Sequence, residues 1–175
     1  SIGRAYGLRT GLFTSPHLLR FNERIQVDGV EIDDDAAARL KRRVEASIAD
    51  VSRHLGQTFG AFEALFALAC LHFQESGCGF AVFEAGIGGR YDPVRLIGAR
   101  ETCVTSVDYE HVELLGNSLE LIASDKSDAC AAGGTIGGTV STGSAIDTIM
   151  IGGTPTTFNS LPIAGVFGAT DITGF

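Results

Sequence analysis

The sequence predicts an α/β fold, a mostly parallel sheet flanked by helices. Three short apolar runs, each followed at once by polar residues, are typical of the buried strands of such a sheet, and they cover residues 9–14, 80–83 and 102–107. Apolar residues that recur every three or four positions predict a helix over 36–55, and a segment that is apolar nearly all round predicts a second helix over 58–73 that lies deep against the sheet. A chain of 175 residues is long enough to bury the core that this fold requires.

The first predicted strand ends at Thr14-Ser15-Pro16, because proline has no N–H to donate to a sheet. A hydroxyl, an imidazole, a carboxylate and a guanidinium follow closely, on Ser15, His17, Glu23 and Arg24. Open α/β sheets bind ligands at the carboxyl ends of their strands, so this stretch is a candidate site. The alternative is a strand that continues into a solvated loop.

The segment between this strand and the helices carries further local signals. Asp28-Gly29 stands between alternating apolar residues and predicts a β-hairpin that projects from the sheet or pairs at its edge. Residues 33–35 are all aspartate, which suits the start of the helix at 36–55. Glu63 lies within the apolar helix at 58–73, where a buried carboxylate has to be paired or used.

The other two strands also end at polar groups. Glu84 follows the second strand, and the glycines of residues 86–89 indicate a close approach of the backbone to a ligand, although their spacing is not the dinucleotide fingerprint. Residues 108–111 follow the third strand and end in His111. Asn117, three residues before Glu120, then predicts the capped start of a short helix that closes near a lysine.

Composition excludes several classes of partner. The formal net charge of −8 argues against nucleic acid and anionic membranes, because phosphate surfaces require a basic face. No apolar run reaches the ~20 residues of a membrane span, and no signal peptide is visible. Four scattered cysteines, without zinc-ligand spacing, predict buried thiols and a reducing cytoplasm.

The composition changes near residue 129, which predicts a core at 1–128 and a tail at 129–175. Residues 131–175 hold two charged side chains, Asp147 and Asp171, among many Gly, Thr and Ser residues. Segments 147–151 and 162–167 are candidate strands of the tail. The abrupt loss of charge would also fit an altered reading frame or a fusion.

Four motifs taken together resemble the folylpolyglutamate synthase/dihydrofolate synthase branch of the Mur ligase superfamily. Their order and spacing fit that family across residues 1–128, and Lys126 stands where the family has its Glu-Lys-Ala-Gly motif. The motifs are Thr14-Ser15-Pro16-His17-Leu18 with Asn22-Glu23-Arg24-Ile25, Phe62-Glu63-Ala64-Leu65, Glu84-Ala85-Gly86-Ile87-Gly88-Gly89-Arg90 with Asp92, and His111-Val112-Glu113-Leu114-Leu115-Gly116-Asn117.

This resemblance implies an ATP-dependent ligase of folate biosynthesis and one-carbon metabolism, a central-domain fragment that uses Mg²⁺ and ATP. A folate-like carboxylate would be phosphorylated and then attacked by the amino group of glutamate. The resemblance implies metal ligands at Ser15, Glu84 and His111, and nucleotide contacts at Ser15, Gly88 and Gly89. It implies substrate contacts at His17, Arg24 and Asp92, and catalytic roles for Lys126 (as a carbamate), His111 and Arg24.

The sequence also departs from the family pattern. The family's Gly-x-x-Gly-Lys-Ser phosphate loop is not in this sequence, and Glu110-His111 replaces an Asp-His pair. Lys126 is followed by Ser127-Asp128 instead of Ala-Gly. These departures support a second hypothesis, a non-catalytic remnant of the fold that acts as a binding or interaction module.

Overall fold

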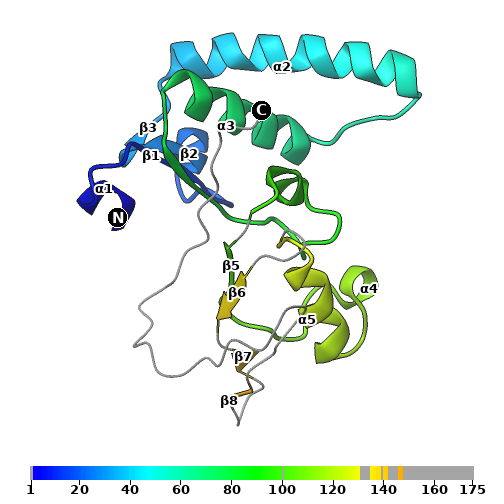
Figure 1. The fold of residues 1–175 in the computed structure, drawn as a ribbon. Coiled ribbons are helices and arrows are strands. Elements are labelled where there is room, and N and C mark those ends of the chain that lie inside the picture. Colours follow the sequence, from blue (N-terminus) through cyan, green and yellow to red (C-terminus); the bar gives the residue numbers. More distant parts are fainter. Residues whose placement is uncertain (1, 100, 131–134, 139, 142–145, 148–175) are drawn as a thin grey trace. The chain divides into compact units, whose positions relative to one another are not determined.

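The computed structural model describes residues 2–99, 101–130, 135–138, 140–141 and 146–147 (Figure 1). These residues fall into two compact units, one that runs to Glu84 and one that begins at Ala85, and each is described here by itself. The candidate strands at 147–151 and 162–167 lie outside the described residues, except for Asp147. Within the described part of the chain, no helix is both long enough and apolar enough to cross a membrane.

The first unit is built on a four-stranded sheet with the strand order β3-β2-β1-β4. Its strands are β1 (Thr10–Phe13), β2 (Ile25–Val27), β3 (Val30–Glu31) and β4 (Phe80–Phe83). Strands β1 and β4 pair in parallel with Phe13 opposite Phe83, whereas β2 pairs antiparallel with both β1 and β3. The predicted α/β class is confirmed, and the sheet is mixed because the hairpin adds two antiparallel pairings to the parallel one.

The hairpin predicted at Asp28-Gly29 joins β2 to β3. Asp28 and Gly29 have φ angles of 53° and 80°, the left-handed conformation that a two-residue hairpin turn favours. The Asp28 carboxylate accepts a hydrogen bond from the Thr10 N–H (2.9 Å), and the Asp28 N–H donates to the Thr10 carbonyl (2.8 Å). The turn is therefore fastened to the first residue of β1, and the hairpin extends the sheet.

The first unit also contains a short helix, α1 (Ile2–Ala5), and two long ones, α2 (Asp34–Leu55) and α3 (Ala61–Glu75), with α3 against β1 and α2 against α3 (Figure 1). Helix α2 begins where the Asp33 carboxylate accepts a hydrogen bond from the backbone of the first turn, and it ends at Gly56, which has a φ of 65°. Both boundaries lie close to those that the sequence predicts.

The core of the first unit is a cluster of aromatic rings between the sheet and α3. Phe13 is fully buried, and its ring centroid lies 6.4 Å from that of Phe66 and 5.9 Å from that of Phe83. Helix α3 can approach β1 this closely because residue 11 is glycine. A Cβ atom on Gly11 would lie 2.7 Å from the ring of Phe73.

Helix α3 differs from the prediction at its start. It begins at Ala61 instead of Thr58, and Glu63 in its first turn is exposed. The expectation that Glu63 is a buried carboxylate in need of a partner was wrong. Its carboxylate lies back over the helix start near Gly60, where a negative charge offsets the helix dipole.

The second unit contains short elements around a small core. They are η2 (Pro93–Ile97), β5 (Glu101–Val104), α4 (Val112–Leu115), α5 (Leu119–Ser127), β6 (Thr135–Gly138), β7 (Val140–Ser141) and β8 (Ile146–Asp147). Strands β5 and β6 pair in parallel, and β7 and β8 pair antiparallel. Helix α5 packs inward with Ile122 and Ala123, against Val107 and Leu115.

The cap of helix α5 is one residue later than predicted. The hydroxyl of Ser118 accepts the hydrogen bond from the Leu121 N–H (3.3 Å), so Ser118 is the cap and Asn117 precedes it. Serine and asparagine cap helices about equally well, so spacing alone could not decide between two adjacent candidates.

Cys70, Cys78 and Cys103 are free thiols, as predicted. Burial raises the pKa of all three, and it raises the pKa of Cys70 to about 12. These thiols therefore remain protonated at neutral pH, which makes them poor nucleophiles and poor metal ligands.

Candidate functional site

The carboxyl ends of β1 and β4 bring Ser15 and Glu84 together. Because Phe13 and Phe83 are partners in a parallel pairing, the residues that follow them leave the sheet at the same edge. The Ser15 N–H donates a hydrogen bond to Glu84 Oε2 (2.8 Å), and the Glu84 N–H donates to the Phe13 carbonyl (2.9 Å). Two of the three predicted metal ligands are thus neighbours within the first unit.

The Ser15–Glu84 corner suits a hard cation. Glu84 is exposed, and its Oε1 atom makes no hydrogen bond to any residue that the structure describes. A carboxylate oxygen and a hydroxyl are the kinds of ligand that Mg²⁺ binds, with water and phosphate oxygens in its remaining positions. Within the described ranges, no group of three or more His, Cys, Asp or Glu side chains is arranged to hold a metal. A metal site at this corner stays a prediction.

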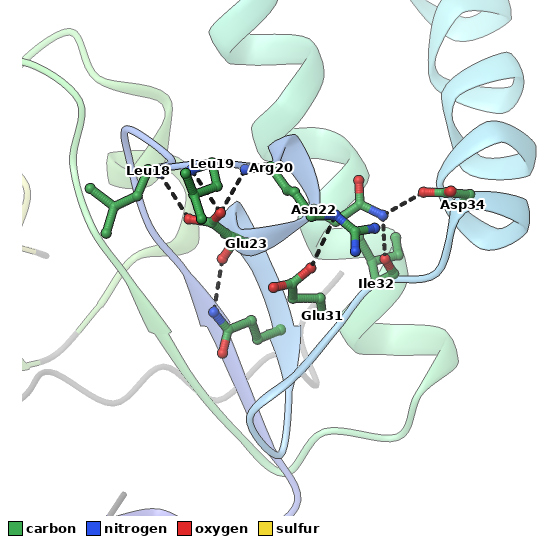
Figure 2. Close-up of polar contacts among 9 residues, drawn as sticks. Leu18, Leu19, Arg20, Asn22, Glu23, Glu31, Ile32 and Asp34 are labelled. Atoms are coloured by element: carbon green, nitrogen blue, oxygen red, sulfur yellow. Dashed lines mark hydrogen bonds and ion pairs between the residues drawn. The ribbon is translucent and has the colours of Figure 1, made fainter.

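The loop after Ser15 is held by Glu23, in the short helix η1 (Phe21–Arg24). The two carboxylate oxygens accept hydrogen bonds from the N–H groups of Leu18 (2.8 Å), Leu19 (2.9 Å) and Arg20 (2.6 Å), as Figure 2 shows. These N–H groups hold the pKa of the Glu23 carboxyl below its usual range. The Glu23 carboxylate therefore holds the loop after Ser15 in place.

Asn22 fastens the same short helix to the rest of the first unit. Asn22 is buried, and its amide Nδ2 donates to the Ile32 carbonyl and to Asp34 Oδ1, each at 2.7 Å (Figure 2). These bonds reach the segment just after β3 and the first residue of α2. Glu23 thus joins η1 to the loop before it, and Asn22 joins η1 to Ile32 and Asp34.

His17 and Arg24 form the polar face of this loop. Arg24 Nε donates a hydrogen bond to His17 Nδ1 (2.8 Å), and the His17 ring meets the Phe21 ring edge to face, with centroids 6.2 Å apart. The structure brings together two of the three predicted substrate contacts. The hydrogen bond also fixes Nδ1 of the imidazole as the acceptor, which leaves the proton on Nε2.

Asp92 organises the segment that follows Glu84. This buried carboxylate accepts hydrogen bonds from the N–H groups of Gly86 (2.7 Å), Ile87 (3.3 Å) and Val94 (3.0 Å), and it caps η2. Three internal donors occupy the side chain that the resemblance places in substrate binding. A contact from Asp92 to substrate stays a prediction.

The remaining predicted residues lie in the second unit. Lys126 Nζ forms an ion pair with Glu110 Oε1 (2.5 Å), next to His111, whose side chain is exposed. His111 precedes α4 and has a φ of 45°, an uncommon conformation for a residue with a side chain. Gly88 and Gly89 pack against helix α5.

Known proteins match most of this chain, although no family model does. The dihydrofolate synthase/folylpolyglutamate synthase of Bacillus subtilis is 36% identical over 123 residues, which are 69% of this chain and 28% of that protein. The folylpolyglutamate synthase of Arabidopsis thaliana is 36% identical over 136 residues, which are 73% of this chain and 22% of that protein. A solved FPGS–AMPPCP–folate complex matches with a TM-score of 0.72 and 33% identity, over 79% of this chain and 34% of the other.

The chain is homologous to a segment of the folylpolyglutamate and dihydrofolate synthases. The family resemblance of its motifs is thereby confirmed, and so is the fold class. The chain spans only about a quarter of the length of these two curated synthases, 28% and 22%.

Glu23 belongs to the predicted motif Asn22-Glu23-Arg24-Ile25, but its hydrogen bonds to the loop after Ser15 were not predicted. In a capping box, the residue just before a helix pairs with a glutamate three positions later. Arg20 and Glu23 have this spacing, so the pattern could have predicted the hydrogen bond from the Arg20 N–H to Glu23. The other two depend on how the loop folds back over η1. Asp125, which holds the glycine loop, carried no such signal and was missed.

We expect Glu23→Gln to loosen the loop after Ser15, because the amide keeps one acceptor oxygen and loses the charge. Hydrogen exchange of the Leu18, Leu19 and Arg20 amides should become several-fold faster. The hydrogen bonds from these N–H groups lower the pKa of the Glu23 carboxyl, so its hold on the loop is present at neutral pH and is lost as the pH falls through the lowered pKa. Glu31→Gln is the control. Glu31 forms a solvent-exposed ion pair with the Arg20 side chain (4.0 Å), so its replacement should leave hydrogen exchange of these amides unchanged. Equal effects of the two substitutions on hydrogen exchange would contradict the role of Glu23 in holding the loop.

Proposed function

We propose that this chain is part of an ATP-dependent carboxylate–amine ligase that adds glutamate to a folate or pteroate. The observation that carries the proposal is the Ser15–Glu84 corner, formed where two parallel strands end. The homology supports it, since the related synthases are ATP-dependent glutamate ligases of folates. The solved neighbour is a complex with folate and AMPPCP, an ATP analogue.

The proposed reaction has two steps. The substrate carboxylate attacks the γ-phosphorus of ATP, which releases ADP and leaves an acyl phosphate. The amino group of glutamate then attacks the acyl carbon, and inorganic phosphate leaves as the amide forms. Mg²⁺, when bound, would neutralise charge on the transferring phosphoryl group.

The residues of the first unit have distinct parts in this proposal. Ser15 and Glu84 would hold the metal, which would supply charge neutralisation at the transferring phosphate. Arg24 binds an anionic oxygen of the substrate, for which its planar guanidinium is suited, and His17 fixes the direction of that guanidinium through their hydrogen bond. In the second unit, we propose Lys126 as the further catalytic group, and the metal-binding role of His111 stays a prediction.

The setting of the proposed reaction follows from the charge and the cysteines. A net charge of −8 favours small-molecule substrates over nucleic acid or an anionic membrane. Free thiols at Cys70, Cys78 and Cys103 agree with a reducing cytoplasm, where the proposed ligase would meet ATP and glutamate.

The competing function is a binding module without catalysis. The ion pair between Lys126 and Glu110 favours it, because an ammonium that is already neutralised by a carboxylate is less available to become a carbamate. A binding module would hold its ligand without a metal.

Titration of the folded chain with AMPPCP, in the presence of Mg²⁺ or of EDTA, separates the two functions. The ligase proposal predicts that Mg²⁺ tightens AMPPCP binding by about tenfold or more, because the metal joins the corner to the phosphates. Circular dichroism before each titration confirms that the chain is folded. AMPPCP affinity that does not respond to Mg²⁺, or no binding by the folded chain, would reject ligase activity of this chain by itself and favour the binding module.

A further inference from the structure

The second unit contains a buried carboxylate, Asp125, in the last turns of α5. Asp125 is 7% exposed, and its Oδ1 accepts hydrogen bonds from the N–H groups of Gly89 (3.0 Å) and Arg90 (3.4 Å). Its Oδ2 lies 4.0 Å from the Arg90 guanidinium. A buried carboxylate is stable only when it is paired and hydrogen-bonded, so Asp125 depends on the glycine loop for its partners.

The two glycines of the loop fit the same contact. Gly88 has a φ of 63°, and a Cβ atom built there would clash with Asp125 Oδ1. A Cβ atom on Gly89 would lie 2.5 Å from the carbonyl oxygen of Lys126 and 2.7 Å from the nitrogen of Ala129, both backbone atoms that cannot move aside. The glycines therefore allow helix α5 to approach the loop closely.

The contact also sets the direction of the next residue in the helix. Successive residues of an α-helix differ by about 100° in direction, so a helix that turns Asp125 toward the loop turns Lys126 to a neighbouring face. There Lys126 meets the carboxylate of Glu110, beside His111. Rotation of α5 would break both contacts together.

We propose that Asp125 is a positioning residue that holds α5 in the rotation that presents Lys126 to Glu110. Its carboxylate accepts the hydrogen bonds of two N–H groups of the glycine loop and so uses the loop as an anchor. The proposed role of Lys126 in catalysis rests on the ligase function above, but the positioning of Lys126 by Asp125 does not.

The test compares Asp125→Asn with Asp128→Asn, in the whole chain and without metal or nucleotide. Asp128 is the matched control, because it lies on the same helix end and pairs with Arg90 (2.6 Å) at a more exposed place. Two quantities are measured: hydrogen exchange of the Gly89 amide, and the rate at which a small acylating reagent modifies Lys126, followed by mass spectrometry.

We expect Asp125→Asn to accelerate Gly89 exchange about tenfold, as the loss of a charge-assisted hydrogen bond implies, and to raise Lys126 acylation severalfold. Asp128→Asn should change neither. Faster Gly89 exchange with unchanged acylation would make Asp125 a loop anchor only and overturn the proposal. No change in either quantity would overturn it as well. Asparagine keeps one acceptor oxygen, so this variant is expected to fold, and Asp125→Ala is the stronger second variant.

Discussion

Phe13→Ala is expected to lower the free energy of unfolding of the first unit by about 3–5 kcal/mol, the usual cost of removing a buried phenyl ring. Phe13 is fully buried against the rings of Phe62, Phe66 and Phe83, so the cavity would form at the centre of the core. Urea unfolding followed by circular dichroism measures the change.

Phe59→Ala is the matched control, because the same ring is removed from a side chain that is 39% exposed. Its expected cost is below about 1 kcal/mol. The Phe13 carbonyl also accepts the hydrogen bond from the Glu84 N–H, so the core substitution should disturb the Ser15–Glu84 corner as well. Similar costs for the two substitutions would contradict the assignment of Phe13 to the core.

The Ser15–Glu84 neighbourhood could be predicted from the sequence because it depends on a general rule. Two short apolar runs predict parallel strands, and the residues after parallel neighbours leave the sheet at one edge. The hairpin at Asp28-Gly29 was predictable for a similar reason, since the turn chemistry is local.

Other features depend on contacts between distant segments and could not be predicted. The glycines at 88 and 89 signal a close approach, but the sequence does not reveal that the approaching group is α5, 36 positions later at Asp125. Glu63 was misjudged because apolar neighbours predicted burial, whereas its place in the first turn of α3 leaves it exposed.

Glu84→Gln is expected to weaken binding of Mn²⁺, used as a probe for Mg²⁺, by about tenfold or more, because an amide oxygen replaces a charged ligand. The amide oxygen can still accept the hydrogen bond from the Ser15 N–H, so the free energy of unfolding should change by less than about 1 kcal/mol. Calorimetric titration gives the affinity. Glu101→Gln, at an exposed carboxylate on β5, is the control and should leave Mn²⁺ affinity unchanged.

Paramagnetic broadening by Mn²⁺ tests the proposed metal site at the Ser15–Glu84 corner most directly, because it shows which residues lie near the bound ion. At substoichiometric Mn²⁺, the amide NMR signals of Ser15 and Glu84 should broaden first in the native chain and stay sharp in Glu84→Gln. Broadening that centres on the aspartates at 33–35 while the Ser15 signal stays sharp, or broadening at Ser15 that persists in Glu84→Gln, would contradict a metal site at this corner.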